Sequence, residues 1–216
     1  MDCCSPNGLN EMFNESAAKK ELKSYQKKGL AKRARTLVDF LRQQDVSEAT
    51  ILEIGGGIGA VHLELMKAGA AKAVGVDASS AYVKTATGLA KSMGYGNAVE
   101  YHVGNFAEKE KDIPGADIVL LDRVICCYPD MKTLVTASGR HAQRLCALTY
   151  PRRTWPIRAG VSLTNFGMAI LRRPFRIFVH RPQEVAATLA FQGFSRVFEA
   201  YAGFGRIWEI AVYQRQ

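Results

Sequence analysis

The chain has 216 residues, 48% of them hydrophobic, which is enough to bury one sizeable core, and its composition requires no second domain. No run of about eighteen uninterrupted apolar residues predicts a transmembrane helix, and the N-terminus lacks the pattern of a signal peptide. We therefore expect a cytoplasmic protein in which residues 1–216 form a single domain.

The five cysteines favour reduced thiols over disulfides or a metal site. They occur as two adjacent pairs, Cys3 with Cys4 and Cys126 with Cys127, plus the single Cys146. This arrangement matches neither a disulfide framework nor paired zinc ligands. Two roles stay open for Cys126 and Cys127: binding of a soft metal or an arsenical, or packing as small apolar side chains.

The net charge of +9 comes from one region of the chain. Residues 131–183 contain Lys132 and nine arginines but no Asp or Glu, whereas the remaining residues are close to neutral. The positive charge therefore belongs to a particular segment and not to the fold as a whole.

Residues 1–45 are predicted to form a helical N-terminal extension. Leu30, Ala34, Leu37 and Leu41 recur at helical spacing, and Gly29 can divide the segment into two helices. Its many lysines and arginines fit either a solvated helix face or contact with nucleic acid or another anionic partner.

Residues 51–60 read as a buried strand that runs into a glycine-rich loop. Gly55, Gly57 and Ala60 match the spacing of dinucleotide-binding loops, in which backbone N–H groups and the following helix N-terminus meet a nucleotide. Glu53 lies two positions before the first glycine and would repel a pyrophosphate. A second short strand ends at Asp77, where a carboxylate can accept hydrogen bonds from both hydroxyls of a ribose.

Two further strands place polar residues at the same edge of the sheet. Residues 98–103 form a third strand, followed by Asn105 and Phe106, an amide and an apolar ring that can contact a base. Residues 116–122 form the clearest buried strand, and the loop after it begins with Asp122 and Arg123 and includes Tyr128. The carboxyl edge of an open parallel sheet binds ligands, so these residues are candidates for contacts with the cofactor or the substrate.

After a fifth strand at residues 145–150 the chain inserts residues 152–178, which we predict to contain a mostly apolar helix with arginines. An insertion of this length in a compact domain is usually a lid or a binding loop. A helix then begins near residue 181, and residues 195–201 and 206–213 are predicted to form a terminal hairpin.

The whole pattern resembles the class I S-adenosylmethionine (SAM) methyltransferases. Glu53-x-Gly55-x-Gly57-x-Gly59 is similar to their first motif, in which a nearby carboxylate suits the cationic methionine end of SAM. Gly104, Asn105 and Phe106 resemble the family's adenine-bracketing segment, although the family often has Asp at the second position. A terminal antiparallel hairpin is typical of this family, whereas dehydrogenase sheets end in a parallel strand. The insertion resembles the substrate-covering segment of Mg-protoporphyrin O-methyltransferases and their relatives.

The resemblance implies an α/β, Rossmann-like, doubly wound seven-stranded sheet with an antiparallel C-terminal hairpin and a lid insertion after strand 5. It implies SAM as the cofactor, with S-adenosylhomocysteine (SAH) as its product. The expected cofactor contacts are Tyr25, Glu53, Gly55, Gly57, Asp77, Asn105, Phe106, Asp122 and Arg123. The expected substrate contacts lie on the lid: Arg152, Arg153, Trp155, Arg158, Phe166 and Arg176.

We expect methyl transfer to oxygen or nitrogen of a small acceptor, either anionic or lipophilic, because guanidinium groups bind carboxylates and phosphates. His180 and Tyr128 are the candidates for proton removal. Two alternatives stay open: an RNA- or nucleic-acid-modifying methyltransferase, and a non-catalytic SAM-binding or membrane-surface module. No metal ligand set is predicted, and the oligomeric state is not determined by the sequence.

Overall fold

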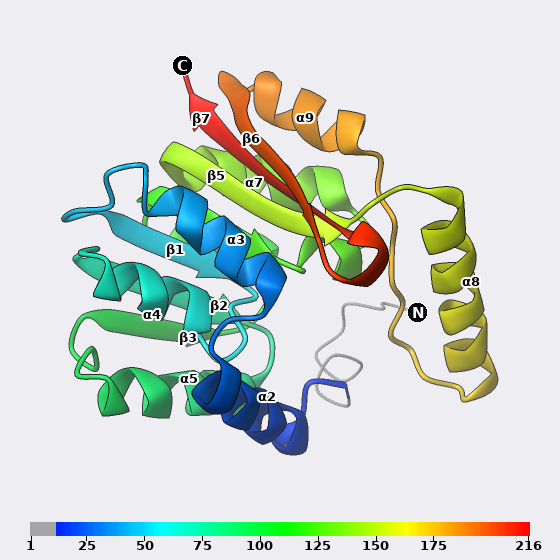
Figure 1. Ribbon diagram of the computed structural model, residues 1–216, viewed down its shortest axis with the longest axis horizontal. Helices are drawn as coiled ribbons and strands as arrows, with labels where there is room; N and C mark the ends of the chain where they lie inside the picture. Colours follow the sequence, from blue (N-terminus) through cyan, green and yellow to red (C-terminus); the bar gives the residue numbers. More distant parts are fainter. Residues whose placement is uncertain (1–11) are drawn as a thin grey trace.

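The computed structural model describes residues 12–216, so Cys3 and Cys4 lie outside the described residues. A seven-stranded sheet forms the centre of the described part, with the order β3-β2-β1-β4-β5-β7-β6 (Figure 1). The strands are β1 Thr50–Ile54, β2 Lys72–Asp77, β3 Val99–Val103, β4 Ala116–Asp122, β5 Ala142–Pro151, β6 Phe194–Ala202 and β7 Trp208–Arg215. Strands β1 to β5 pair in parallel, and β7 runs antiparallel between β5 and β6.

This arrangement confirms the predicted sheet and its antiparallel C-terminal hairpin. Strand β4 has the predicted bounds, and helix α7 (Met131–His141) follows it in the chain. Strand β7 begins at Trp208, two residues later than predicted, because residues 204–206 form a short 3-10 turn, η3 (Phe204–Arg206). Gly205 adopts a left-handed φ of 65° in this turn, a conformation that glycine reaches without steric cost.

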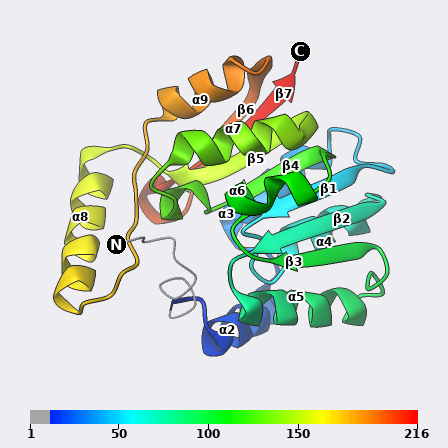
Figure 2. The same cartoon turned by 180° about the vertical axis from the view of Figure 1, so that it is seen from behind.

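Helices cover both faces of the sheet (Figures 1 and 2). On one face pack α3 (Lys32–Leu41), α4 (Ala60–Lys67) and α5 (Ser80–Ser92), and on the other α6 (Phe106–Lys109), α7 and α9 (Pro182–Ala190). The buried side chains of β4 alternate between the two cores, Ile118 and Leu120 in one and Val119 and Leu121 in the other. Such two-sided burial explains why this strand reads as a continuous apolar run. Two more 3-10 turns, η1 (Glu110–Asp112) and η2 (Ile125–Cys127), flank β4.

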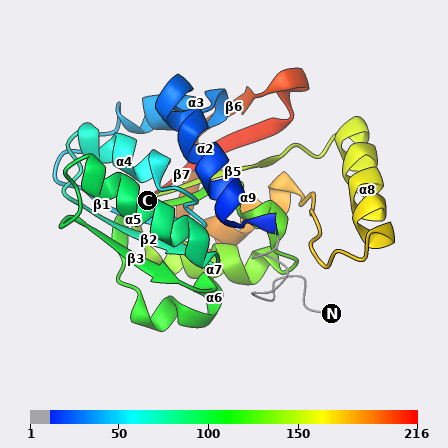
Figure 3. The same cartoon turned by 90° about the horizontal axis from the view of Figure 1, so that it is seen from below.

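The N-terminal extension forms two helices, as predicted. Helix α2 (Glu15–Lys28) ends at Gly29, whose φ is 68°, and α3 begins at Lys32. Ala18 of α2 is fully buried in the core, and Asn14 caps the helix by accepting a hydrogen bond from Ala17 N. The extension is thus packed onto the sheet domain (Figure 3).

The insertion after β5 forms helix α8 (Trp155–Ile170), which stands apart from the sheet in every view (Figures 1–3). None of its residues is buried. No helix within residues 12–216 is long and apolar enough to cross a membrane.

Candidate active site

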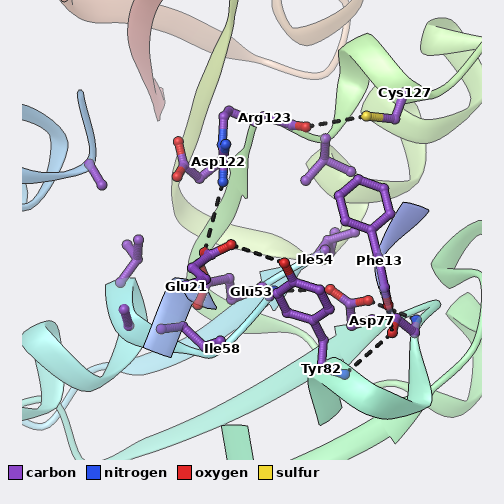
Figure 4. A pocket seen from close by; sticks show the side chains of 18 of the residues that line it. Phe13, Glu21, Glu53, Ile54, Ile58, Asp77, Tyr82, Asp122, Arg123 and Cys127 are labelled. Carbon is purple, nitrogen blue, oxygen red and sulfur yellow. Dashed lines mark hydrogen bonds and ion pairs between the residues drawn. The ribbon is translucent and has the colours of Figure 1, made fainter. Parts of the chain in front are cut away.

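A cavity of about 660 Å³ opens at the carboxyl ends of the parallel strands, a volume within the range of small-molecule sites. Its wall combines the glycine loop, the ends of β2 and β4, helices α2 and α3, and the segment that returns from α8. Figure 4 shows part of this wall, with side chains from the N-terminal helix facing those of the strand ends.

The glycine loop follows β1 closely and leaves no room for larger side chains. Gly55 has a φ of 63°, and a Cβ at this position would lie 2.6 Å from Cγ2 of Val124. A Cβ on Gly59 would lie 2.7 Å from the ring of His62. The glycines are therefore required by the left-handed backbone and by the neighbours that press on the loop.

Glu53 lines the cavity but also holds a buried histidine. Its Oε2 accepts hydrogen bonds from His62 Nδ1, at 2.5 Å, and from His62 N, at 3.3 Å. His62 Nε2 lies 2.9 Å from the hydroxyl of Tyr101. Glu53 and His62 are both essentially inaccessible to solvent. The carboxylate is thus fixed in orientation at the end of β1.

Asp77 lies at the end of β2, where the sequence predicted an acid. Its Oδ2 accepts a hydrogen bond from Gly57 N at 2.9 Å, and its Oδ1 accepts one from Ser79 N at 2.8 Å. Burial raises the pKa of Asp77 to about 6, against the effect of these two backbone bonds, and the charges of Glu53 and Glu21 add to the rise. A hydroxyl donor at this carboxylate would favour its ionised form.

Asn105 and Phe106 begin α6 and also line the cavity. Asn105 Nδ2 donates to the hydroxyl of Tyr128 at 3.2 Å and to Glu108 Oε1 at 2.8 Å. The Phe106 ring is buried and packs edge-on against His141. Asn105 thereby connects the end of β3 with the loop that follows β4.

Asp122 is paired with a residue of the N-terminal extension. Arg33 donates from Nε and Nη2 to the two carboxylate oxygens, each at 2.6 Å, and Thr149 donates to Oδ1. Burial alone would raise the pKa of Asp122, but the bonds and charge of Arg33 outweigh it and hold the pKa below its ordinary value. Arg33 also lies over the ring of Trp208.

The loop after Asp122 brings Arg123, Cys126, Cys127 and Tyr128 to the cavity. Arg123 has a φ of 64°, and its guanidinium lies 3.9 Å from Glu21 of α2. The two sulfurs lie 3.9 Å apart, and both thiols donate to the carbonyl of Arg123.

The N-terminal segment covers the cavity, which the sequence did not reveal beyond Tyr25. Glu21 accepts a hydrogen bond from the Tyr82 hydroxyl at 3.1 Å (Figure 4). The Phe13 ring contacts Phe175 edge-on, with ring centroids 5.8 Å apart. Tyr25 lines the cavity, although its hydroxyl donates to Glu64 at 2.6 Å.

The nine predicted cofactor contacts all line this one cavity: Tyr25, Glu53, Gly55, Gly57, Asp77, Asn105, Phe106, Asp122 and Arg123. The six predicted substrate contacts do not: Arg152, Arg153, Trp155, Arg158, Phe166 and Arg176. Arg152 lies over the ring of Tyr201 at 4.1 Å, and Arg176 donates to the carbonyls of Arg173 and Phe175. Phe175 and Ile177, from the segment after α8, are the insertion residues that reach the cavity.

Of the two predicted proton acceptors, only Tyr128 lines the cavity. His180 Nε2 donates to the carbonyls of Ile125, at 2.8 Å, and Tyr128, at 3.0 Å. The ring of His180 thus braces the loop after β4 from outside the cavity.

The parallel sheet with its antiparallel last strand β7, the glycine loop after β1 and the acid at the end of β2 together define the class I methyltransferase fold. Residues 45–151 match the family model of the methyltransferase domain. This part of the chain therefore matches a methyltransferase domain, and the predicted fold and enzyme class are confirmed.

Solved structures show the same fold over nearly the whole chain. Magnesium protoporphyrin IX methyltransferase from Synechocystis PCC 6803, with bound SAH, has a TM-score of 0.78 and 17% sequence identity, covering 98% of this chain and 99% of that one. An O-methyltransferase family protein from Burkholderia thailandensis has a TM-score of 0.70 and 14% identity, covering 96% of this chain and 63% of that one. A search of curated proteins found no match.

Proposed function

We propose that the protein transfers the methyl group of SAM to a carboxylate oxygen of a small lipophilic acid. The observation that carries this proposal is the composition of the cavity wall. The cofactor-binding residues share the cavity with apolar side chains that the cofactor's polar groups do not require: Phe13, Val124, Phe175, Ile177 and Trp208. These apolar side chains would contact the acceptor.

The hydrogen-bonding groups at the strand ends indicate where in the cavity the cofactor would bind. Asp77 would accept hydrogen bonds from the ribose hydroxyls, and Asn105 with Phe106 would contact the adenine. Glu53, held by His62, would lie near the cationic methionine end of SAM. The Synechocystis structures with bound SAH and SAM, which share this fold, support the assignment.

The part of the cavity that we assign to the acceptor carries positive charge beside its apolar side chains. Lys20 and Arg123 both line the cavity. We assign Arg123 to the acceptor, although the sequence placed it among the cofactor contacts, because the ion pair that its guanidinium forms within residues 12–216 is a long one, 3.9 Å from Glu21. A guanidinium is suited to bind a carboxylate through two parallel hydrogen bonds. An acid with an apolar body therefore matches this part of the wall better than a neutral or cationic acceptor.

The choice of a carboxylate as the acceptor also rests on proton chemistry. Carboxylates are already ionised near neutral pH, so their methylation needs no general base. Within residues 12–216 no histidine lines the cavity. Tyr128 lines the cavity, and its hydroxyl accepts a hydrogen bond from Asn105 Nδ2 at 3.2 Å. The rate enhancement would come from holding the sulfonium methyl and the oxygen in line and excluding water, aided by the contact of Phe13 with Phe175.

Methylation assays with a panel of aromatic and aliphatic acids test this proposal, with the corresponding alcohols and amines as comparison. We expect methyl ester formation from the acids alone. Arg123→Gln should raise the KM for the acid about tenfold or more and leave SAH affinity nearly unchanged, whereas Arg181→Gln, at an exposed position outside the cavity, should change neither. Tyr128→Phe should keep kcat within about tenfold, because losing a general base would cost about 10²- to 10⁴-fold. Methylation of amines but not acids would refute the carboxylate assignment.

A further inference from the structure

Helix α8 carries an apolar stripe that faces solvent. Trp155, Leu163, Phe166 and Ile170 are 80%, 71%, 65% and 65% exposed. Their spacing places them within roughly 80° of one another around the helix axis, since successive residues are about 100° apart. Four large apolar side chains on one exposed face form a patch of the kind that marks an interaction surface.

The opposite face of α8 is fixed to the rest of the protein. Ile157, Val161 and Met168 are half-buried there. Asn165, on the same face, donates from Nδ2 to Ile177 O at 2.7 Å and accepts from Ile177 N at 2.9 Å. Ile177 itself lines the cavity. The helix is therefore attached, through its inner face, to the segment that forms part of the cavity wall.

Both ends of the insertion are also anchored. At the start, Arg152 N donates to Ile207 O at 2.8 Å. At the end, Phe178 N donates to Cys126 O at 2.7 Å, and His180 braces the same loop. Turning the exposed stripe of α8 over the cavity would break the bonds of Asn165, so this geometry orients the stripe away from the active site.

The surroundings of the stripe are strongly cationic. Arg153, Arg158, Arg172 and Arg173 are exposed on α8 or within three residues of its ends, and the sequence has no Asp or Glu between residues 131 and 183. Arginine side chains beside an apolar helix face can reach the phosphates of lipid headgroups while the apolar groups enter the acyl region. Each such cation adds to the attraction toward an anionic leaflet.

We propose that α8 is an interfacial helix that docks the protein on an anionic lipid bilayer, with Trp155, Leu163, Phe166 and Ile170 inserted and the arginines at the headgroups. Charge complementarity favours an anionic partner, and the apolar stripe favours lipid over nucleic acid, which offers phosphates but no hydrocarbon phase. Since Ile177 joins α8 to the cavity wall, docking would bring the cavity close to the membrane. The inference itself does not depend on the proposed acceptor.

Sedimentation of the full chain with vesicles tests the proposal. We expect binding to vesicles of phosphatidylcholine with phosphatidylglycerol, weaker binding as salt rises, and little binding to phosphatidylcholine alone. The triple variant Leu163→Ser, Phe166→Ser, Ile170→Ser should bind the anionic vesicles at least tenfold more weakly. Phe191→Ser is the matched control, because Phe191 is 95% exposed but lies outside α8, and it should bind like the original chain.

Calorimetry with SAH on the same samples shows whether each variant is folded. Unchanged SAH affinity together with lost vesicle binding supports the proposal, whatever the acceptor of the enzyme is. Several results would overturn it: no binding of the full chain to anionic vesicles, equal binding by the triple variant, or self-association in solution that the triple variant abolishes. Binding to RNA in a mobility-shift assay with no binding to vesicles would also overturn it.

Discussion

Arg33 in the N-terminal extension donates two hydrogen bonds to Asp122 at the end of β4, 89 residues further along the chain. Both side chains are about one-tenth exposed, and the aromatic ring of Trp208 lies beside the guanidinium. This pair fixes helix α3 to the strand whose end forms the active-site wall. The extension is therefore part of the site and not an appendage to it.

Breaking this pair should destabilise the protein strongly. Arg33→Met leaves a buried carboxylate without its partner, and we expect a loss of about 3–5 kcal/mol in the free energy of unfolding, measured by urea denaturation. Arg42→Met is the control, because its pair with Glu64 is much more exposed and should be worth less than about 1 kcal/mol. In Arg33→Met, Asp122→Asn the loss should be clearly smaller than the sum of the two single losses. An additive result would show that the two residues do not interact.

The same pair predicts a pH dependence of stability. Because the pKa of Asp122 is held below its ordinary value, its contribution is present above the ordinary pKa of an aspartate and is lost as the pH falls through the lower folded value. Acid titration of the unfolding free energy should therefore show a decline in this range that is smaller in Asp122→Asn. Equal declines in both proteins would contradict the assignment.

Two glycines offer a test of the loop after β1. In Gly55→Ala the new methyl group would meet Val124 at 2.6 Å and would force an alanine into a left-handed backbone, so we expect a loss of about 1–3 kcal/mol in stability and weaker SAH binding. Gly88→Ala adds a methyl group to helix α5 with no heavy atom within 4 Å, and it should stabilise the protein by about 0.5–1 kcal/mol. Thermal unfolding and calorimetry measure both effects. Similar behaviour of the two variants would contradict the steric argument.

The strands, the loop and the cofactor-facing residues of the site could be predicted because their sequence signals are local. Buried strands, a glycine loop and acids at strand ends appear within short stretches, and the nine predicted cofactor contacts line one cavity. Pairs such as Arg33 with Asp122 could not be predicted, since nothing in the sequence relates residues so far apart. The pairing of His62 with Glu53 had a weak local signal: His62 lies in the first turn of the helix after the loop and faces back toward the strand.

The insertion was harder to interpret because α8 is apolar on both faces. Its sequence predicts a helix, which α8 confirms, but the pattern does not tell which face packs against the protein. In the structure Asn165 identifies the inner face of α8, because its side chain is hydrogen-bonded to the backbone of Ile177. Phe13 and Phe175 close the cavity where the sequence suggested Trp155 and Phe166.

Cofactor binding should depend on the ionisation of Asp77. Its pKa is raised to about 6 by burial, and ribose hydroxyls donate best to the ionised form. SAH affinity should therefore be constant above about pH 7 and should fall by up to about tenfold per pH unit below about pH 6. Calorimetry across this range should show the decline in the original protein, while Asp77→Asn should bind more weakly at neutral pH and lack the decline. A pH-independent affinity would show that Asp77 does not bind the ligand in its ionised form.

His180 should act by positioning the loop after β4 and not by removing a proton. Its Nε2 is engaged with the carbonyls of Ile125 and Tyr128, and its ring does not line the cavity. We expect His180→Ala to lose about 1–2 kcal/mol of stability, because two partly buried acceptors lose their donor, and to keep kcat within about tenfold with an unchanged pH profile. His180→Gln retains an N–H donor and should recover part of the stability. Steady-state kinetics across pH, together with urea denaturation, measure both properties. A fall in kcat of about 10²- to 10⁴-fold, with loss of a titration near neutral pH, would instead identify His180 as the general base.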